Sequence, residues 1–210
     1  TTCDLSTGSN GTYFSVLFGS IPKNFNITGG TFNIYVPDGS NAYMNSSVPF
    51  YNLNVQGVNT SSDLRVVQYT RPSTSAPPTL GPQPLVVLND LTLQSNAVLN
   101  TTIPNPDVNV SVGGDFTVSS TAIYTPGDNT TGFNGTRTQL FDIQGAVSGN
   151  LNNLAIIDSS NLTLNNANVA VPVIVRSEFR LNPGSTFNDN GRILEVRGNL
   201  VNSGTHFRPV

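Results

Sequence analysis

Short runs of alternating hydrophobic and polar residues recur along the whole chain and predict β-strands. The stretch at 150–171, NLNNLAIIDSSNLTLNNANVAV, is typical, because Asn, Ser or Asp separates its short apolar runs. Apolar residues rarely recur at the three- and four-residue spacing of a helix, and Gly, Pro, Asn or Asp interrupts nearly every window. The chain is therefore expected to be all-β. The predicted strands cover 31–36, 51–55, 63–67, 84–88, 90–93, 108–112, 115–118, 153–157, 161–164, 171–175, 178–181 and 193–196.

Two all-β architectures fit these strands, a parallel β-helix and an antiparallel β-sandwich. The hairpins of a sandwich favour Asn-Gly or Asp-Gly in two-residue loops. Asn-Gly occurs only at 10–11, 134–135 and 190–191, and Asp-Gly only at 38–39. The single polar residues and short Asn, Ser or Gly segments between the strands fit the corners of a coil instead. We predict a right-handed parallel β-helix, with a β-sandwich as the second choice.

Several segments of the first half of the chain align with segments of the second half in the same order. These alignments predict two divergent copies of a repeating unit of about 85–100 residues. The aligned pairs are 50–55 with 151–156, 63–67 with 161–165, 84–100 with 171–188, and 108–118 with 193–202.

The repeat suggests how the chain is divided. We expect an N-terminal cap or first strands over 1–30, a first repeat unit over 31–130 and a second over 131–210. We also expect the native protein to continue beyond Val210. The Pro-rich segment 71–84 has no counterpart in the second copy, and its prolines cannot donate to a strand ladder. An exposed loop is therefore predicted there, either as a tolerated insertion or as a recognition loop.

The corners of the coil are expected to carry Asn and Gly. Asn tolerates the left-handed conformation that a tight corner needs, and glycine adopts it without steric cost. The segments VGGDF and RGNL occupy matching places in the two aligned copies. The predicted corner residues are Gly113, Gly114, Gly198, Asn161 and Asn165.

Composition narrows the classes of function. Charged residues make up 10% of the chain, against roughly 25% in an average soluble domain, and the formal net charge is −3. The basic residues are scattered and form no stripe, which argues against a nucleic-acid partner. No apolar run approaches the roughly 20 residues that cross a bilayer. Cys3 is the only cysteine, so no disulfide forms within the chain; it is either an inert thiol or pairs outside this segment.

The second half of the chain resembles a known class of repeats. The segments TGFNGTRTQLFDIQGAVSGNLNNLAIIDSSNLTLNNANVAVPVIVRSEFRL at 131–181 and GRILEVRGNLVNSGTHF at 191–207 are similar to the β-solenoid repeats of large secreted and surface proteins of Bacteroidota. The resemblance implies an extracellular or cell-surface adhesin, exported by the type IX system and including adhesins used in gliding. It implies no catalytic residues.

One segment, FNDNGRILEVR at 187–197, gathers the residue types that could carry chemistry: Asp189, Arg192, Glu195 and Arg197. In an extended strand Glu195 and Arg197 lie on the same face, so a surface ion pair is the favoured interpretation. A catalytic or sugar-binding group is the alternative.

Metal and histidine chemistry receive little support from the sequence. The Asp-Asn-Gly in this segment resembles a calcium loop but lacks the bidentate Glu at the required offset, so we predict no cofactor, with calcium as the alternative. His206 is the only histidine, which argues against a zinc site or a His-based triad and favours an exposed or rim position.

We therefore predict a non-catalytic structural or adhesive module that acts as a stiff stalk or a binding surface. Its expected partner is an extracellular polysaccharide or protein. The alternative is a carbohydrate-binding or polysaccharide-degrading β-helix, although the chain has no Trp and its six Tyr are dispersed. A lesser alternative is a subunit that associates with itself into an extracellular filament.

Overall fold

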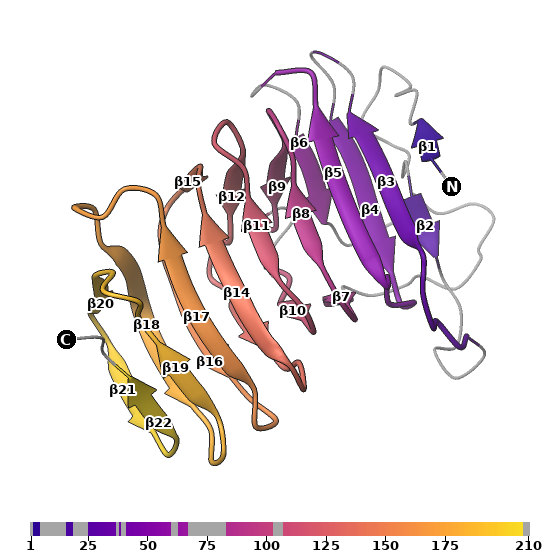
Figure 1. The fold of residues 1–210 in the computed structure, drawn as a ribbon. Helices are drawn as coiled ribbons and strands as arrows, with labels where there is room; N and C mark the ends of the chain where they lie inside the picture. Colours follow the sequence, from indigo (N-terminus) through magenta and orange to yellow (C-terminus); the bar gives the residue numbers. More distant parts are fainter. Residues whose placement is uncertain are drawn as a thin grey trace.

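The fold is built from parallel β-strands. The computed structural model describes residues 2–4, 16–18, 25–36, 38, 41–59, 63–66, 83–102 and 107–207. Every regular element in these residues is a strand, and every strand pairing is parallel (Figure 1). The strands stack into a right-handed β-solenoid, which confirms the predicted β-helix and not the sandwich.

The strands form three sheets, here named A, B and C. Sheet A contains nine strands: β1 (Thr2–Asp4), β3 (Thr31–Val36), β5 (Asn52–Gly57), β8 (Leu91–Leu93), β11 (Phe116–Val118), β14 (Thr138–Ile143), β17 (Asn161–Asn166), β19 (Thr186–Asn188) and β22 (Thr205–Phe207). Sheet B contains six: β2 (Val16–Phe18), β4 (Asn41–Ser46), β6 (Asp63–Val66), β9 (Val98–Asn100), β12 (Ile123–Thr125) and β15 (Ala146–Val147). Sheet C contains seven: β7 (Leu85–Val87), β10 (Val110–Val112), β13 (Thr130–Phe133), β16 (Leu151–Ile156), β18 (Val173–Leu181), β20 (Leu194–Val196) and β21 (Asn199–Asn202).

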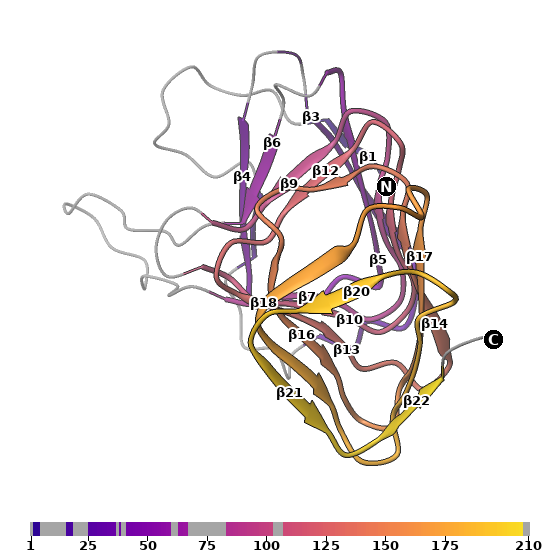
Figure 2. The same ribbon diagram turned by 90° about the vertical axis from the view of Figure 1, so that its left-hand side faces the viewer.

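The hydrophobic core fills the interior of the coils. Figure 2 shows the path of the backbone around this interior. Residues at the same place in successive coils stack on one another, because each strand pairs in register with the strand one coil later. Leu53, Leu91, Phe116 and Phe141 form one such row, and all four are fully buried. The rings of Phe116 and Phe141 are stacked with centroids 5.2 Å apart. Burial of each of these side chains contributes on the order of 2 kcal/mol.

One coil is the repeating unit of the structure. Equivalent positions are separated by 21 residues between Asn33 and Asn54 and by 25 between Asp90 and Asp115. The interval from Asn52 to Asp90 is longer, at 38 residues, yet the two positions stay in register. The Pro-rich loop predicted at 71–84 falls within this interval, and its residues 71–82 lie outside the described part of the chain.

The longer repeat predicted from the alignments coincides with the structure only in part. Segments 84–88 and 171–175 both contribute to sheet C, through β7 and β18. By contrast, 50–55 contributes to sheet A through β5, whereas 151–156 forms β16 of sheet C. The aligned segments therefore do not occupy equivalent places in the coil throughout.

The predicted corners are partly displaced. Gly113 and Gly114 lie at the turn between β10 and β11, and Gly198 lies between β20 and β21. Asn161 and Asn165, however, lie within β17 and not at a corner. Leu162 and Leu164 point into the core, so the asparagines that alternate with them point outward. Left-handed backbone occurs instead at residues with positive φ, which include Asn96, Asn150 and Asn190.

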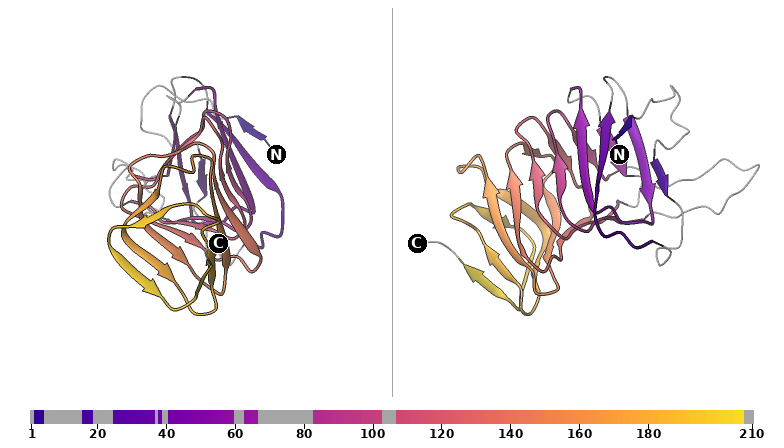
Figure 3. Two further views of the ribbon diagram at one scale, coloured as in Figure 1. Left: turned by 60° about the vertical axis from the view of Figure 1, so that its left-hand side comes forward. Right: turned by 45° about the vertical axis from the view of Figure 1, so that its right-hand side comes forward.

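Sheet B stops before the other two sheets. Its last strand is β15, whereas sheet A continues through β17, β19 and β22 and sheet C through β16, β18, β20 and β21. After β17 the chain turns through residues 167–172 and enters β18, which pairs with β16, β20 and β21. The first part of β18 crosses the outline of the coil obliquely in Figure 2. Figure 3 shows the stack from two further directions, with the indigo strands at one end and the yellow strands at the other.

Candidate functional site

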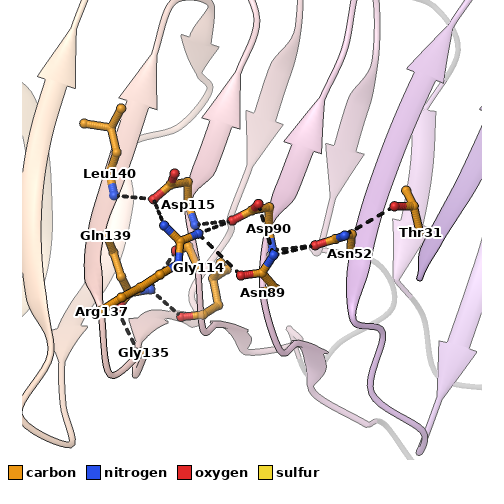
Figure 4. Close-up of polar contacts among 11 residues, drawn as sticks. Thr31, Asn52, Asn89, Asp90, Gly114, Asp115, Gly135, Arg137, Gln139 and Leu140 are labelled. Atoms are coloured by element: carbon orange, nitrogen blue, oxygen red, sulfur yellow. Dashed lines mark hydrogen bonds and ion pairs between the residues drawn. The ribbon is translucent and has the colours of Figure 1, made fainter. Parts of the chain in front are cut away.

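A continuous line of polar side chains crosses sheet A and forms an outward cluster of hydrogen bonds (Figure 4). Asn52, Asp90, Asp115 and Leu140 occupy the same register position in successive coils. We call the side chains of Asn52, Asp90 and Asp115 the polar staircase. Each of their Oδ1 atoms accepts a hydrogen bond from the backbone N–H one coil later, at 3.1 Å to Asp90, 2.9 Å to Asp115 and 2.8 Å to Leu140.

The sequence explains why these residues stand there. Asn and Asp have short side chains whose oxygens reach nearby backbone N–H groups and compete with regular ladder bonds at the ends of strands. Asn52 begins β5, and Asp90 and Asp115 directly precede β8 and β11. The position is therefore the corner where the chain passes from sheet C into sheet A.

Arg137 joins two steps of the staircase. Its guanidinium forms ion pairs with Oδ1 of Asp90 and, at 3.4 Å, with Oδ1 of Asp115. Carboxylates at one register position on neighbouring parallel strands lie about 5 Å apart and repel each other. A positive charge between them offsets that repulsion. All three side chains remain more than a third exposed, so the stabilisation is modest because water screens it.

A buried glutamine and two glycines support the cluster from below. Gln139 is fully buried, and its Nε2 donates to the carbonyl oxygens of Val112 and Gly114 at 2.9 and 2.6 Å. Its Oε1 accepts from the N–H of Gly135 at 2.9 Å. A Cβ on Gly114 would collide with Oδ1 of Asp90 and with the guanidinium of Arg137. The predicted corner residue Gly114 is thus needed because the staircase passes directly over it.

The arrangement limits what the two carboxylates can do chemically. Oδ1 of Asp90 accepts from the N–H of Asp115 and from Arg137, and Oδ2 accepts from Nδ2 of Asn89 at 3.1 Å. Oδ1 of Asp115 accepts from the N–H of Leu140 and from Arg137. A general base needs an oxygen within reach of the substrate's proton. Both Oδ1 atoms are already occupied by bonds that tie coils together.

The candidate residues predicted from the sequence separate into two pairs. Glu195 and Arg197 form an exposed ion pair with Nε and Oε1 2.6 Å apart, as predicted. Asp189 is buried, accepts from the N–H of Gly191 at 2.9 Å, and contacts Nε2 of His206 at 3.1 Å. Its own backbone oxygen accepts from the N–H of Arg192 at 2.8 Å.

A cavity of about 330 Å³ lies beside Asp189 and His206. Asp189, Arg192 and His206 line it together with apolar residues, whereas Glu195 and Arg197 do not. The guanidinium of Arg192 donates to Oδ1 of Asn165 at 3.3 Å. The ring of His206 packs on Phe187 with centroids 5.4 Å apart, and the side chain is 44% exposed, which agrees with a rim position.

A second polar network is enclosed in the core. The hydroxyl of Tyr124 and Oγ1 of Thr131 are 2.8 Å apart, and both residues are fully buried. Nearby, Nδ2 of Asn129 donates to Oγ1 of Thr101 at 2.6 Å. Burial raises the pKa of the Tyr124 hydroxyl above its ordinary value of 10.0, because the charged form would lose its hydration. Buried polar groups are stable in such an interior when they are neutral and hydrogen-bonded to one another, as these are.

The third feature is an apolar cavity of about 350 Å³ near the start of the chain. The rings of Phe18, Phe32 and Phe50 meet there, with centroid separations between 5.2 and 6.1 Å. Apart from the backbone of Gly29 and Gly30, its polar lining consists of Thr31, Tyr51 and Asn52.

The described residues contain no set of three or more His, Cys, Asp or Glu side chains that could hold a metal ion. They also contain no helix long and apolar enough to cross a membrane. The structure does not test whether the chain binds a cofactor, so the absence of a cofactor stays a prediction from the sequence.

The staircase was not found by sequence reasoning, although a signal for it exists. Asp90 and Asp115 each begin a similar segment, DLTL and DFTV, 25 residues apart. That spacing equals one coil, so the recurrence of Asp at the head of both segments predicts a stacked pair once the coil length is known. Arg137 carries no comparable local pattern.

Comparison with known proteins gives no match for this chain among protein-family models, curated proteins or solved structures.

Proposed function

We propose that this chain is a non-catalytic structural and adhesive module of a large extracellular or cell-surface protein, in which it acts as a stiff stalk or a binding surface. The observation that carries the proposal is the polar staircase, because its side chains bind the next coil. Other outward side chains behave in the same way: Nδ2 of Asn54 donates to Oδ1 of Asn33 at 3.0 Å, and Nδ2 of Asn165 donates to Oδ1 of Asp142 at 2.7 Å. Such bonds join neighbouring coils and stiffen the stack.

A carbohydrate-binding or polysaccharide-degrading β-helix is the second candidate. One observation favours it: Asp90 and Asp115 place two carboxylates on adjacent coils of one sheet, with Arg137 beside them. Pairs of carboxylates are the catalytic groups of most glycoside hydrolases. Against this alternative stand the backbone N–H groups and the guanidinium that already occupy Oδ1 of both residues.

The structural role of the staircase is tested by truncating Asp115. Asp115→Ala removes the acceptor of the Leu140 N–H, so we expect the free energy of unfolding in urea to fall by about 1–2 kcal/mol. Asp115→Asn keeps an oxygen at this position and should cost less than about 1 kcal/mol. Thr117→Ala, two residues later in β11 and also directed outward, measures the cost of shortening an outward side chain alone.

Enzymatic activity is tested separately with a panel of neutral and acidic polysaccharides. The proposal expects no new reducing ends and no unsaturated products from the wild-type chain. Release of product that disappears in Asp90→Asn or Asp115→Asn would establish the second candidate, since both variants retain the shape of the side chain. An Asp115→Ala variant as stable as the wild type would remove the observation on which the structural role rests.

A further inference from the structure

Sheet B has an open edge in the middle of the described chain. Its last strand, β15, pairs with β12 and with no other strand among the described residues. Sheets A and C continue beyond this level, so the edge lies beside further coils and not at an end of the stack (Figure 1). A parallel edge of this kind carries backbone N–H and C=O groups that can pair with an added strand.

The backbone of β15 is oriented for such pairing. The N–H groups of Ala146 and Ser148 donate back to the preceding coil, to the oxygens of Ala122 and Tyr124 at 3.0 and 2.7 Å. Because successive residues of a strand direct their polar groups to opposite sides, the N–H and C=O of Val147 point away from β12. These are the groups that the next strand of sheet B would bind.

The following coil does not supply that strand, because its chain folds on itself. After β17, Nδ2 of Asn166 donates to the oxygen of Val171 at 2.9 Å, and Oδ1 of Asn166 accepts from the N–H of Asn168 at 3.1 Å. The N–H of Val171 donates to the oxygen of Asn168 at 3.1 Å. The N–H of Ala167 donates to the oxygen of Ile143 at the end of β14, at 2.8 Å. The bonds described for residues 168–171 are made within the turn, and none of them reaches β15.

A cavity of about 300 Å³ separates β15 from this turn. Its lining comes from both coils and is mixed, because Asn150, Asn166 and Asn168 line it together with apolar residues, and no charged residue does. Val171, which lines it, is half exposed. The apolar walls are Ile143, Val147, Val171, Pro172, Val173 and Ile174.

The stacking of sheet B specifies what would fit. Leu99, Tyr124 and Val147 follow one another in the inward row of this sheet. In a strand added in the same register, the residue paired with Val147 would direct its side chain into the cavity. We expect that side chain to be apolar, because it would continue the row of Leu99, Tyr124 and Val147 and because no charged residue in the lining could pair with a charge.

We propose that the edge of β15 is a strand-addition site, which binds a short, neutral, extended peptide segment of another protein in parallel orientation with one apolar side chain in the cavity. Backbone hydrogen bonds to Val147 would provide affinity, and the cavity would select the side chain, as in other cases of binding by strand addition. This site does not depend on the stalk or adhesive role proposed above.

The probe is a fluorescent peptide with the sequence of this chain's own β9 region, SNAVLNT from residues 95–101, which already forms a parallel strand of sheet B. Peptides with Ile, Val, Phe, Ala or Asp at the position of Leu99 complete the set. We expect binding by anisotropy for the peptides with a large apolar residue and at least a tenfold loss for the Asp peptide. Amide chemical shifts should move at Gly145, Val147 and Val171.

The decisive variant is Val147→Pro, which removes the outward N–H while keeping the bonds to β12, a position at which an edge strand tolerates proline. It should lose peptide binding at least tenfold with an unchanged urea midpoint. Leu200→Pro, at the open edge of β21, is the matched control and should bind like the wild type. If no apolar peptide binds, or if Val147→Pro binds the peptide as tightly as the wild type, the proposed site is overturned. Neither result affects the proposed function.

Discussion

At the scale of single residues, the buried hydroxyl of Tyr124 couples stability to pH. Burial raises its pKa above the ordinary value of 10.0, so the folded chain keeps this proton at pH values where the unfolded chain loses it. The unfolded state then binds fewer protons, and stability falls as pH rises above about 10, by at most about 1.4 kcal/mol per pH unit. Below that pH the contribution of Tyr124 is fully present. Urea unfolding from about pH 8 to about pH 11 measures the slope.

The double variant Tyr124→Phe/Thr131→Val isolates this effect. Replacing both partners of a buried hydrogen bond by apolar groups of similar shape is close to neutral, so the variant should fold and should lose less stability at high pH. The same slope in the variant and the wild type would assign the alkaline loss to other tyrosines.

The residue scale also shows what the alternation of side chains could and could not predict. Leu162 and Leu164 are buried, as the alternation in NLTL requires. The same alternation places Asn161 and Asn165 on the outward face. They were predicted as corner residues instead, because Asn tolerates the left-handed conformation of a tight corner. Their partners, Thr186 for Asn161 and Asp142 for Asn165, come from neighbouring coils. Contacts of this kind depend on coil length, which no single segment of sequence reveals.

At the scale of elements, the spacing between coils depends on glycine at particular positions. A Cβ on Gly135, between β13 and β14, would collide with the backbone oxygen of Gly113 one coil earlier. Gly132, within β13, has room, since its nearest neighbour would be the oxygen of Val110 at 3.6 Å. We expect Gly135→Ala to lower the free energy of unfolding by about 2 kcal/mol or more and Gly132→Ala to change it by less than about 1 kcal/mol.

Urea denaturation of both variants tests this difference, with Gly132→Ala as the matched control. Equal losses would mean that the close approach of the two backbones at Gly135 does not determine the loss of stability. The intrinsic effect of replacing glycine by alanine would then explain both values. A larger loss in Gly132→Ala would contradict the predicted spacing directly.

The success of strand prediction differed among the three sheets. The predicted strand 31–36 coincides with β3, whereas 171–175 and 178–181 merge into the single strand β18. The strands β4, β9, β12 and β15 of sheet B fall outside every predicted range. β9 and β12 have three residues each and β15 has two, so they are too short for an alternating pattern to stand out.

At the scale of the whole molecule, each coil is stabilised by the coils on both of its sides, so protection should follow the stack. We expect backbone amides of β10, β11, β13 and β14 to exchange hydrogen slowly and those of β20, β21 and β22 to exchange faster. The amide of Val147 should interrupt this gradient, because it lies among protected coils but points away from β12. Hydrogen exchange followed by NMR measures each amide separately.

The Tyr124 amide, on the neighbouring strand of sheet B, is the reference for this measurement. Slow exchange at Val147, comparable with Tyr124, would show that the edge of β15 is covered in solution. Uniform exchange along the chain would contradict stabilisation coil by coil.

The long interval between Asn52 and Asp90 has a consequence for how such a chain evolves. Although 38 residues separate these positions, against 25 for the next step, the side chain of Asn52 still accepts the N–H of Asp90. The two coils thus keep their register across the longer interval. Insertions and deletions at corners can accumulate without disturbing the stack, so new loops can be acquired while the scaffold that presents them is inherited unchanged.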